Sequence, residues 1–409
     1  MERARRELLL EIAESHGTPV YVYDADVLRR QLASLKSFDR VRFAQKACAN
    51  IHILRLLRGE GAVVDCVSPG ELARAMAAGF RIRSEEIVYT ADILARSTLE
   101  QVLEAGVAIN AGSEDMLTQI GEQRRGHPVW LRINPGFGHG HSKKVNTGGE
   151  SSKHGIWHEN LKLALERIDR FELDLVGLHM HIGSGADLEH LARVGDAMVQ
   201  AVERIGRDIR AVSAGGGLSI PYREGEVAID PAQHFAVWDS ARRRIEGHLG
   251  HRVELEIEPG RYLAGPAGIL LAEVRAAKSV GQNHFTLVDA GFNDLVRPSM
   301  YGAYHRISLL ARNDDLERRT LRPTIVAGPL CESGDVFTQD ASANVVPREL
   351  PEARVGDLML FHDAGAYGAA MSSNYNSRPL AAEVLIDGDR ARLIRKRQTI
   401  EDLLLLERT

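Results

Sequence analysis

The sequence contains little cysteine, few aromatic residues and little excess charge. Its 409 residues include three cysteines and 5% aromatic residues, and the formal net charge is −5. Three scattered cysteines argue against a disulfide framework or a metal site and favour a reducing cytoplasm. A weakly acidic chain does not suggest a surface for nucleic acid or for an anionic membrane. No apolar run is long enough to span a bilayer. We therefore expect a cytoplasmic protein without nucleic-acid or membrane partners.

Eight short apolar runs alternate with segments of helical periodicity. The runs span residues 41–46, 63–67, 87–90, 107–110, 129–134, 175–182, 210–214 and 253–258. Strands that alternate with helices predict a parallel sheet, and eight such units favour a (β/α)8 barrel in the α/β class. A doubly wound open sheet is the alternative. It is disfavoured because no Gly-x-Gly-x-x-Gly follows an early strand.

The pattern changes after about residue 270, where strand-like runs follow one another with few long helices. We assign residues 27–270 to the barrel and residues 271–409 to a C-terminal β-rich domain. The run Thr18–Asp24 precedes the barrel and could add a strand to that second domain, so residues 1–26 are expected to contribute to it.

Lys46 closes the first apolar run. If a lysine is buried at the end of a strand, burial disfavours its charged form, and a neutral amine forms a Schiff base with an aldehyde. A lysine whose amine extends from a core strand to solvent is the plainer alternative. Other polar residues also follow barrel strands, where active sites of such barrels lie; Asp65 and Ser68 are examples.

Three consecutive glycines, Gly215, Gly216 and Gly217, follow the seventh run. Backbone N–H groups in such a turn can hold an anion, most often phosphate. Ser184, between two glycines, could add a hydroxyl. An ordinary flexible turn is the alternative. The segment 136–155, rich in glycine, serine and histidine, is either an active-site loop or an inert surface loop.

His179 and His181 lie two apart on one strand and therefore share a face. They could hold a metal, form core hydrogen bonds, or stack on a flat ring. Glu258 ends the eighth run and could pair with a ring nitrogen and keep it protonated, or form a salt bridge with Arg261. A lysine for an aldehyde, a glycine turn for phosphate and an acid for a pyridine nitrogen together indicate pyridoxal 5′-phosphate (PLP).

Longer stretches carry a family resemblance that covers essentially the whole chain. They are Phe-Ala-Gln-Lys46-Ala-Cys-Ala-Asn, Val-Asp65-Cys-Val-Ser, His-Met-His181-Ile-Gly-Ser-Gly, Ala-Gly-Gly-Gly-Leu-Ser, Glu258-Pro-Gly-Arg261, Arg297-Pro-Ser-Met-Tyr301-Gly-Ala-Tyr-His, Gly-Pro-Leu-Cys331-Glu332-Ser-Gly-Asp and Gly-Ala-Tyr367-Gly. The chain resembles the alanine-racemase-fold, or fold-type III, PLP-dependent decarboxylases, and within them the diaminopimelate decarboxylases.

The resemblance implies a role for each matching residue. It implies that Lys46 carries PLP, His181 stacks on its ring and Glu258 pairs with the ring nitrogen. The implied cofactor-binding residues are Lys46, Asp65, His181, Ser184, Gly215, Gly216, Gly217, Glu258, Pro259, Gly260, Arg261 and Tyr367. The implied substrate-binding residues are Arg261, Arg297, Tyr301, Glu332 and Tyr367. Cys331 is the implied proton donor, which makes Lys46, His181 and Cys331 the catalytic set.

The resemblance also implies a reaction and an assembly. The reaction is decarboxylation of meso-2,6-diaminopimelate to L-lysine and CO2, the last step of lysine biosynthesis. Cys331 and Glu332 are implied to reach into the active site of a second subunit, hence a homodimer. The same fold serves ornithine, arginine and carboxynorspermidine decarboxylases, which stay open as alternatives. So do a metal-dependent barrel hydrolase and a PLP-free binding protein, although the first would need further ligands and the second is disfavoured by intact Lys46, Glu258 and Cys331.

Overall fold

The computed structural model describes residues 3–138, 147–183, 187–227, 229–312 and 316–408. Two compact units make up the chain. The first, called the β unit here, comprises Met1–Leu28, Pro221–Glu226 and Ala264–Thr409. The second, called the barrel unit, comprises Arg29–Ile220 and Val227–Leu263. The chain passes between the two units more than once, because residues 221–226 return to the β unit from within the barrel sequence.

The barrel unit contains a closed ring of eight parallel strands. They are β2 (Arg40–Ala44), β3 (Val63–Cys66), β4 (Ile87–Ala91), β5 (Ala108–Ala111), β6 (Pro128–Asn134), β8 (Asp174–Met180), β9 (Ala211–Ser213) and β10 (Glu254–Ile257). The ring closes because β5 pairs with β6 and β10 pairs with β2. The short strand β7 (Ile156–Trp157) pairs with β6 in addition. All eight predicted runs are strands, and the predicted (β/α)8 barrel is confirmed.

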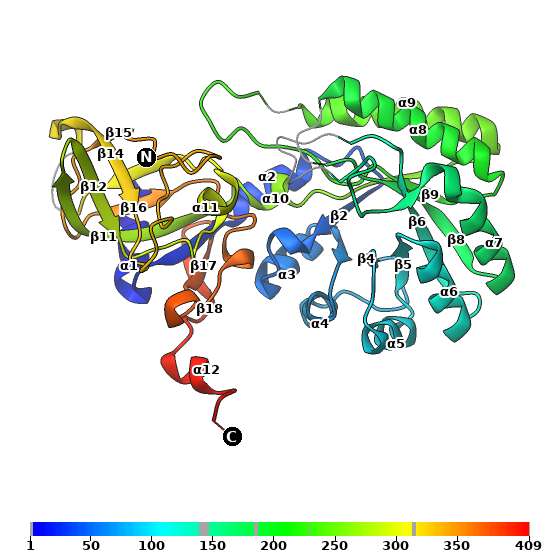
Figure 1. Cartoon of the computed structure of the whole chain (residues 1–409), viewed down its shortest axis with the longest axis horizontal. Helices are drawn as coiled ribbons and strands as arrows, with labels where there is room; N and C mark the ends of the chain where they lie inside the picture. Colours follow the sequence, from blue (N-terminus) through cyan, green and yellow to red (C-terminus); the bar gives the residue numbers. More distant parts are fainter. Residues whose placement is uncertain (1–2, 139–146, 184–186, 228, 313–315, 409) are drawn as a thin grey trace. The chain divides into compact units, whose positions relative to one another are not determined.

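Helices surround this ring on its outer side (Figure 1). They are α3 (Ile51–Gly59), α4 (Pro69–Ala78), α5 (Arg96–Ala105), α6 (Glu114–Gln123), α7 (Leu161–Phe171), α8 (Leu188–Ile205) and α9 (Pro231–Leu249). Local signals start them: the Ser68 hydroxyl accepts from the Glu71 N–H and caps α4, and the Ser113 hydroxyl caps α6 in the same way. On α8, Leu191, Val194 and Met198 are buried at helical spacing, which presents an apolar stripe to the barrel.

The β unit is a mixed sheet with β1 (Val20–Asp24) at its centre. This strand pairs antiparallel with β11 (Gly268–Val280) and parallel with β17 (Ala382–Asp387). The other strands are β12 (Asn283–Val288), β13 (Ile307–Leu310), β14 (Leu321–Ala327), β15 (Arg348–Pro351), β16 (Leu358–Phe361) and β18 (Arg390–Arg395). The expected N-terminal strand is thus confirmed as part of the second sheet.

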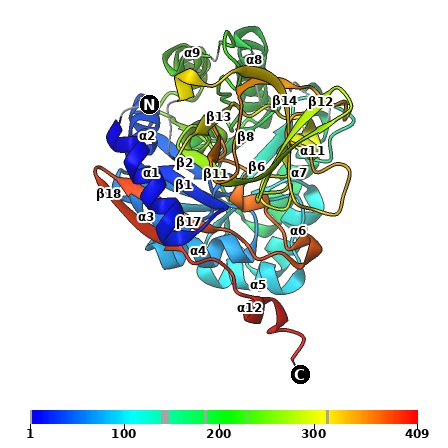
Figure 2. The ribbon, with the colours of Figure 1, turned by 90° about the vertical axis from the view of Figure 1, so that its left-hand side faces the viewer.

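Helix α1 (Arg3–His16) covers this sheet (Figure 2). Its buried residues Leu9, Ile12 and Ala13 pack against the sheet's Val20 and Val22 within one apolar cluster. Shorter helices complete the chain: α2 (Ala25–Ala33), α10 (Arg261–Ala264), α11 (Arg297–Tyr301) and α12 (Ile400–Leu404). Among the described residues, no helix is both long and apolar enough to cross a membrane.

Candidate active site

Lys46 lies just beyond the end of β2, although the expected strand included it. It is in a short 3-10 helix, Gln45–Ala47, directly after β2. Its neighbours Gln45 and Ala47 are buried, whereas Lys46 is exposed. The expectation that Lys46 is buried is therefore wrong. The physical reason is that the strand ends two residues earlier, and the following turn carries the side chain out of the core. At this position the amine is accessible to an aldehyde.

A chain of polar side chains runs along the barrel interior beside Lys46. Asn110 Nδ2 donates to Thr90 Oγ1 over 3.3 Å, and the Thr90 hydroxyl hydrogen-bonds to Asp65. These residues come from the adjacent strands β5, β4 and β3. Burial and the nearby charge of Glu258 raise the pKa of Asp65 to about 8, although Lys46 acts in the opposite direction. Lys46 and Glu258 are thus close enough to Asp65 to influence its charge.

Glu258 follows β10, and both of its carboxylate oxygens accept hydrogen bonds. His179 Nε2, from β8, donates to Oε2 over 2.9 Å, and Ser213 Oγ, from β9, donates to Oε1 over 2.8 Å. Burial alone would raise the pKa of Glu258, but His179, Ser213 and Arg42 outweigh burial and lower that pKa to about 2. Glu258 is therefore an ionised carboxylate, as its predicted role beside a ring nitrogen requires.

His181 directly follows β8 and is partly buried. Burial, and after it the charges of Arg132, Lys46 and His179, lower the pKa of His181 well below its usual value. The imidazole is therefore neutral near pH 7. A neutral flat ring is suited to stacking on another ring.

The three glycines form the tight turn that their sequence predicts. A Cβ on Gly215 would lie 2.5 Å from the Met180 carbonyl oxygen, and one on Gly216 would lie 2.7 Å from the Glu258 carbonyl oxygen. The same Gly216 Cβ would lie 3.7 Å from Cε1 of His181. Only glycine lets the backbone come this close to the strand ends. The turn therefore lies beside both His181 and Glu258.

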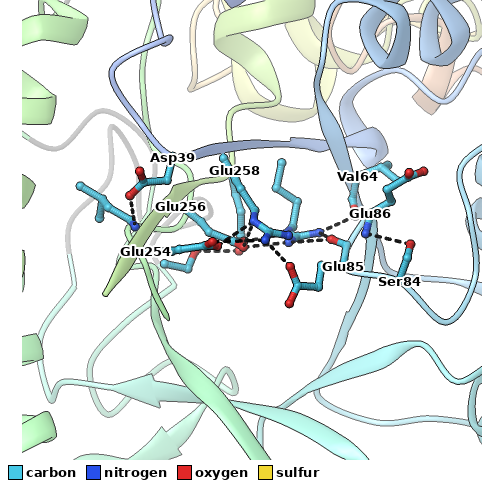
Figure 3. Close-up of polar contacts among 12 residues, drawn as sticks. Asp39, Val64, Ser84, Glu85, Glu86, Glu254, Glu256 and Glu258 are labelled. Atoms are coloured by element: carbon cyan, nitrogen blue, oxygen red, sulfur yellow. Dashed lines mark hydrogen bonds and ion pairs between the residues drawn. The ribbon is translucent and has the colours of Figure 1, made fainter. Parts of the chain in front are cut away.

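Glu256, which lies beside Glu258 (Figure 3), forms a buried ion pair with Arg42. Arg42 and Glu256 are only 1% and 3% exposed. Arg42 Nε donates to Glu256 Oε2 over 2.8 Å and Nη2 donates to Oε1 over 3.0 Å. The guanidinium also donates to the carbonyl oxygens of Val64 and Glu85. The charge of Arg42 is one of the causes that keep Glu258 ionised.

The substrate-binding residues predicted from the resemblance include several in the β unit. Arg297 begins α11 and is buried. Its Nη1 donates to His305 Nε2 over 2.9 Å, and its guanidinium lies 4.9 Å from the ring centre of Tyr222. His305 Nδ1 in turn donates to the His362 carbonyl over 2.9 Å, because an imidazole that accepts at Nε2 carries its proton on Nδ1.

The remaining predicted residues lie on turns. Tyr301 ends α11, and Tyr367 has a φ of 58°, which a bulky residue rarely adopts. Cys331 and Glu332 are exposed on one loop, and the Cys331 N–H donates to Asn376 Oδ1 over 2.9 Å. In the barrel unit, Pro259 and Gly260 connect Glu258 to Arg261, where α10 begins. Ser184 lies outside the described residues.

Sequence reasoning missed two contributors to the site. Arg132 is a buried cation within the apolar run of β6, and its charge acts on both His181 and Asp92. A single arginine inside an apolar strand could have indicated this buried charge from the sequence. Ser213 carried no such signal, since serine is common near turns.

The loop 136–155 is described in part: Thr147 Oγ1 donates to the His181 carbonyl over 2.9 Å, and His154 pairs with Asp92.

His179 acts through a hydrogen bond. Its Nε2 donates to Glu258, as expected of a histidine that forms core hydrogen bonds, while Nδ1 is buried without a partner among the described residues. Within the residues that the structure describes, no group of three or more histidine, cysteine, aspartate or glutamate side chains is arranged to hold a metal ion.

Comparison with known proteins places these residues in a family context. Residues 24–265 match the family described as pyridoxal-dependent decarboxylase, pyridoxal binding domain. The chain is 59% identical over 404 residues to a diaminopimelate decarboxylase of Escherichia coli K12, covering 98% of this chain and 96% of that protein. It is also 59% identical over 401 residues to a diaminopimelate decarboxylase of Streptomyces coelicolor, covering 98% and 91%.

Solved structures agree with these sequence matches. A crystal structure of a diaminopimelate decarboxylase superposes with a TM-score of 0.96 at 58% identity, covering 98% of this chain and 96% of the other. The Helicobacter pylori diaminopimelate decarboxylase complexed with L-lysine superposes with a TM-score of 0.85 at 32% identity, covering 98% and 99%.

The residues of the barrel unit fit a pyridoxal cofactor. The backbone of the glycine turn lies so close to the strand ends that it admits no Cβ, and backbone N–H groups in such a turn can hold a phosphate. An ionised, buried Glu258 suits a protonated ring nitrogen, and Lys46 offers an accessible amine. Among the described residues, Asp65 Oδ1 is buried without a hydrogen-bond partner, so it is a further polar atom that could bind a ligand.

Proposed function

We propose that this chain, which belongs to the diaminopimelate decarboxylases within the pyridoxal-dependent decarboxylases, converts meso-2,6-diaminopimelate to L-lysine and CO2. This reaction is the last step of lysine biosynthesis. The observation that carries the proposal is the grouping of Lys46, an ionised Glu258 and the glycine turn at one end of the barrel. We further propose that the protein acts in the cytoplasm.

In this proposal the barrel unit holds the cofactor. Bound PLP would supply an aldehyde for amine attachment and a ring that accepts the electron pair left on the α-carbon when CO2 departs. Lys46 would hold the cofactor covalently, His181 would stack on its ring, and Glu258 would keep a proton on the ring nitrogen. The remaining contacts to the cofactor come from Asp65, Ser184, Gly215, Gly216, Gly217, Pro259, Gly260, Arg261 and Tyr367.

Substrate recognition is assigned to cations and hydroxyls. The second carboxylate of diaminopimelate distinguishes it from ornithine or arginine, and a guanidinium binds a carboxylate through two parallel hydrogen bonds. Arg261 and Arg297 serve this role, with Tyr301, Glu332 and Tyr367 as further substrate contacts. The bond from His305 and the ring of Tyr222 hold Arg297 in one orientation, which supports its assignment.

Cys331 and Glu332 are proposed to act across a homodimer. Both side chains are exposed on their loop, which leaves them available to the active site of a second subunit. When the bond from the α-carbon to its carboxylate breaks, CO2 leaves and a proton has to take its place. The Cys331 thiol donates that proton to the α-carbon.

The test is a visible spectrum of the purified protein before and after addition of meso-diaminopimelate, with release of CO2 and lysine measured in parallel. We expect a cofactor absorbance band that changes with substrate, together with both products. Lys46→Ala should abolish turnover, whereas Lys162→Ala, at an exposed lysine on α7, should leave it unchanged. A band without turnover of diaminopimelate, but with turnover of ornithine, arginine or carboxynorspermidine, would reassign the substrate. A protein that cannot take up PLP would refute the proposal.

A further inference from the structure

Side chains from two separate strands of the barrel, β8 and β9, hold the carboxylate of Glu258. Its side chain is 10% exposed and that of His179 is 2% exposed, while Ser213 is also buried. His179 Nε2 and Ser213 Oγ bind different oxygens of the carboxylate, over 2.9 and 2.8 Å. The carboxylate therefore cannot rotate without losing a buried hydrogen bond.

These two bonds also decide the charge of Glu258. A carboxyl group removed from water prefers its neutral form, and hydrogen bonds donated to its oxygens reverse that preference. A neutral Glu258 would have no negative charge to hold a proton on a ring nitrogen. The ionised form therefore depends on its donors, of which His179 and Ser213 are in direct contact with it.

Ser213 connects the carboxylate to the glycine turn. The Gly215 N–H donates to Ser213 Oγ over 3.1 Å, so the same hydroxyl that donates to Glu258 accepts from the turn. A second link runs through the backbone, where the Glu258 N–H donates to the Gly215 carbonyl over 2.8 Å. The proposed phosphate site and the proposed ring-nitrogen partner are thus held at a constant separation.

We propose that His179 and Ser213 are positioning residues for Glu258. They act through the carboxylate: they keep it ionised, fix its direction, and set its distance from the glycine turn, so that one cofactor of fixed length meets both sites at once. The inference rests on the proposed function, because it assumes that Glu258 faces the pyridine nitrogen. Neither residue is assigned a direct contact with substrate.

The experiment uses the holoenzyme reconstituted with PLP labelled with ¹⁵N at the ring nitrogen. The nitrogen chemical shift reports its protonation and is read beside kcat and KM. His179→Phe removes the donor at similar volume, and His179→Gln keeps an N–H donor on a shorter chain. Ser213→Ala removes the hydroxyl, and Ser213→Thr keeps it. His127→Gln is the control, since His127 is a buried histidine whose Nε2 bonds to the Val107 carbonyl before β6.

We expect His179→Phe to lower kcat about tenfold to hundredfold, with KM within about threefold of wild type, because a hydrogen bond to a charged group is lost. The nitrogen resonance should move from the pyridinium position toward that of neutral pyridine. Ser213→Ala should shift it in the same direction by less, while His179→Gln and Ser213→Thr should restore most of the wild-type shift. His127→Gln should leave kcat and the shift unchanged.

An unchanged nitrogen shift in both His179→Phe and Ser213→Ala, at any level of activity, would overturn the inference. If His179→Phe does not fold, Ser213→Ala and Ser213→Thr alone decide, since they differ from wild type by one small group. A wild-type holoenzyme that binds PLP but releases no CO2 from diaminopimelate would refute the proposed function instead. The nitrogen shift of that same holoenzyme and its variants would still test the two positioning residues.

Discussion

Replacing Arg42 with methionine should destabilise the barrel unit strongly. The substitution removes one partner of a buried ion pair, and Glu256, only 3% exposed, keeps its charge with Arg40 Nε as a cationic neighbour at 3.6 Å. The backbone carbonyls of Val64 and Glu85 also lose donors. Breaking a buried pair in this way costs about 3–5 kcal/mol, because the buried Glu256 carboxylate loses its close partner and keeps only the more distant Arg40.

Urea unfolding followed by tryptophan fluorescence measures this loss of stability in the barrel unit. All three tryptophans belong to the barrel unit: Trp130 on β6, Trp157 on β7 and Trp238 on α9. With a slope of about 3 kcal/mol per M of urea, the loss corresponds to a midpoint lower by about 1–1.7 M. The fluorescence signal follows this unit without requiring that both units unfold together.

The double variant Arg42→Met with Glu256→Leu separates charge from packing. Replacing both partners with apolar groups removes the uncompensated charge, so the double variant should recover at least half of the lost midpoint. A single variant that unfolds within about 0.3 M of wild type would refute the reasoning, since the pair would then contribute no more than a surface ion pair. A double variant as unstable as the single one would show that lost packing, and not the charge, causes the effect.

Three further predictions follow from the geometry. First, the pKa of Asp65 is raised from 3.8 to about 8 in the folded chain, so the contribution of Asp65 to stability is lost as pH rises between these values. The Asp65→Asn apoprotein should therefore melt at a higher temperature than wild type at about pH 8.5 and at the same temperature at about pH 4. Parallel pH profiles of the two melting temperatures would contradict this prediction. Second, Gly216→Ala should raise the Kd for PLP at least about tenfold, because the new Cβ would lie 2.7 Å from the Glu258 carbonyl oxygen. The control Gly247→Ala, whose Cβ would have no described atom within 4 Å, should leave the Kd unchanged. Equal affinities of the two variants would exclude a tight turn as the phosphate site. Third, His305→Phe should raise KM about tenfold with little change in kcat, because Arg297 loses an acceptor. The control His284→Phe, at a buried histidine of the same unit whose ring nitrogens have no hydrogen-bond partner among the described residues, should leave KM unchanged. An unchanged KM in His305→Phe would separate His305 from substrate binding.

The barrel could be predicted because its signals are local. Each strand is a short apolar run, each outer helix has its own apolar stripe, and Ser68 and Ser113 cap the helices that follow them. The same applies to the glycine turn and to Glu258, since the end of a barrel strand is where such residues meet ligands. The sequence motifs at the ends of the predicted strands, together with the order of those strands, were therefore enough to propose the cofactor and the family.

The partners of these residues could not be predicted, because they come from strands far apart in the sequence. His179 and Glu258 are separated by 79 positions and Ser213 and Glu258 by 45, and only closure of the barrel brings them within 3 Å. The sequence alone left His179 between a metal ligand, a core histidine and a stacked ring. The tertiary structure shows that Nε2 of His179 donates to Glu258, and among the described residues no group of three or more histidine, cysteine, aspartate or glutamate side chains could hold a metal ion with it.

The sequence by itself determined the order of strands and helices, the polar residues at their ends and the chemistry those residue types allow. Tertiary structure decided exposure, charge and direction. It placed Lys46 in an exposed turn, paired Arg42 with Glu256 inside the barrel and kept Glu258 ionised between two donors. The physical reason is that backbone propensity and hydrophobic periodicity act over a few residues, whereas burial and electrostatics depend on whichever groups the closed sheet brings together.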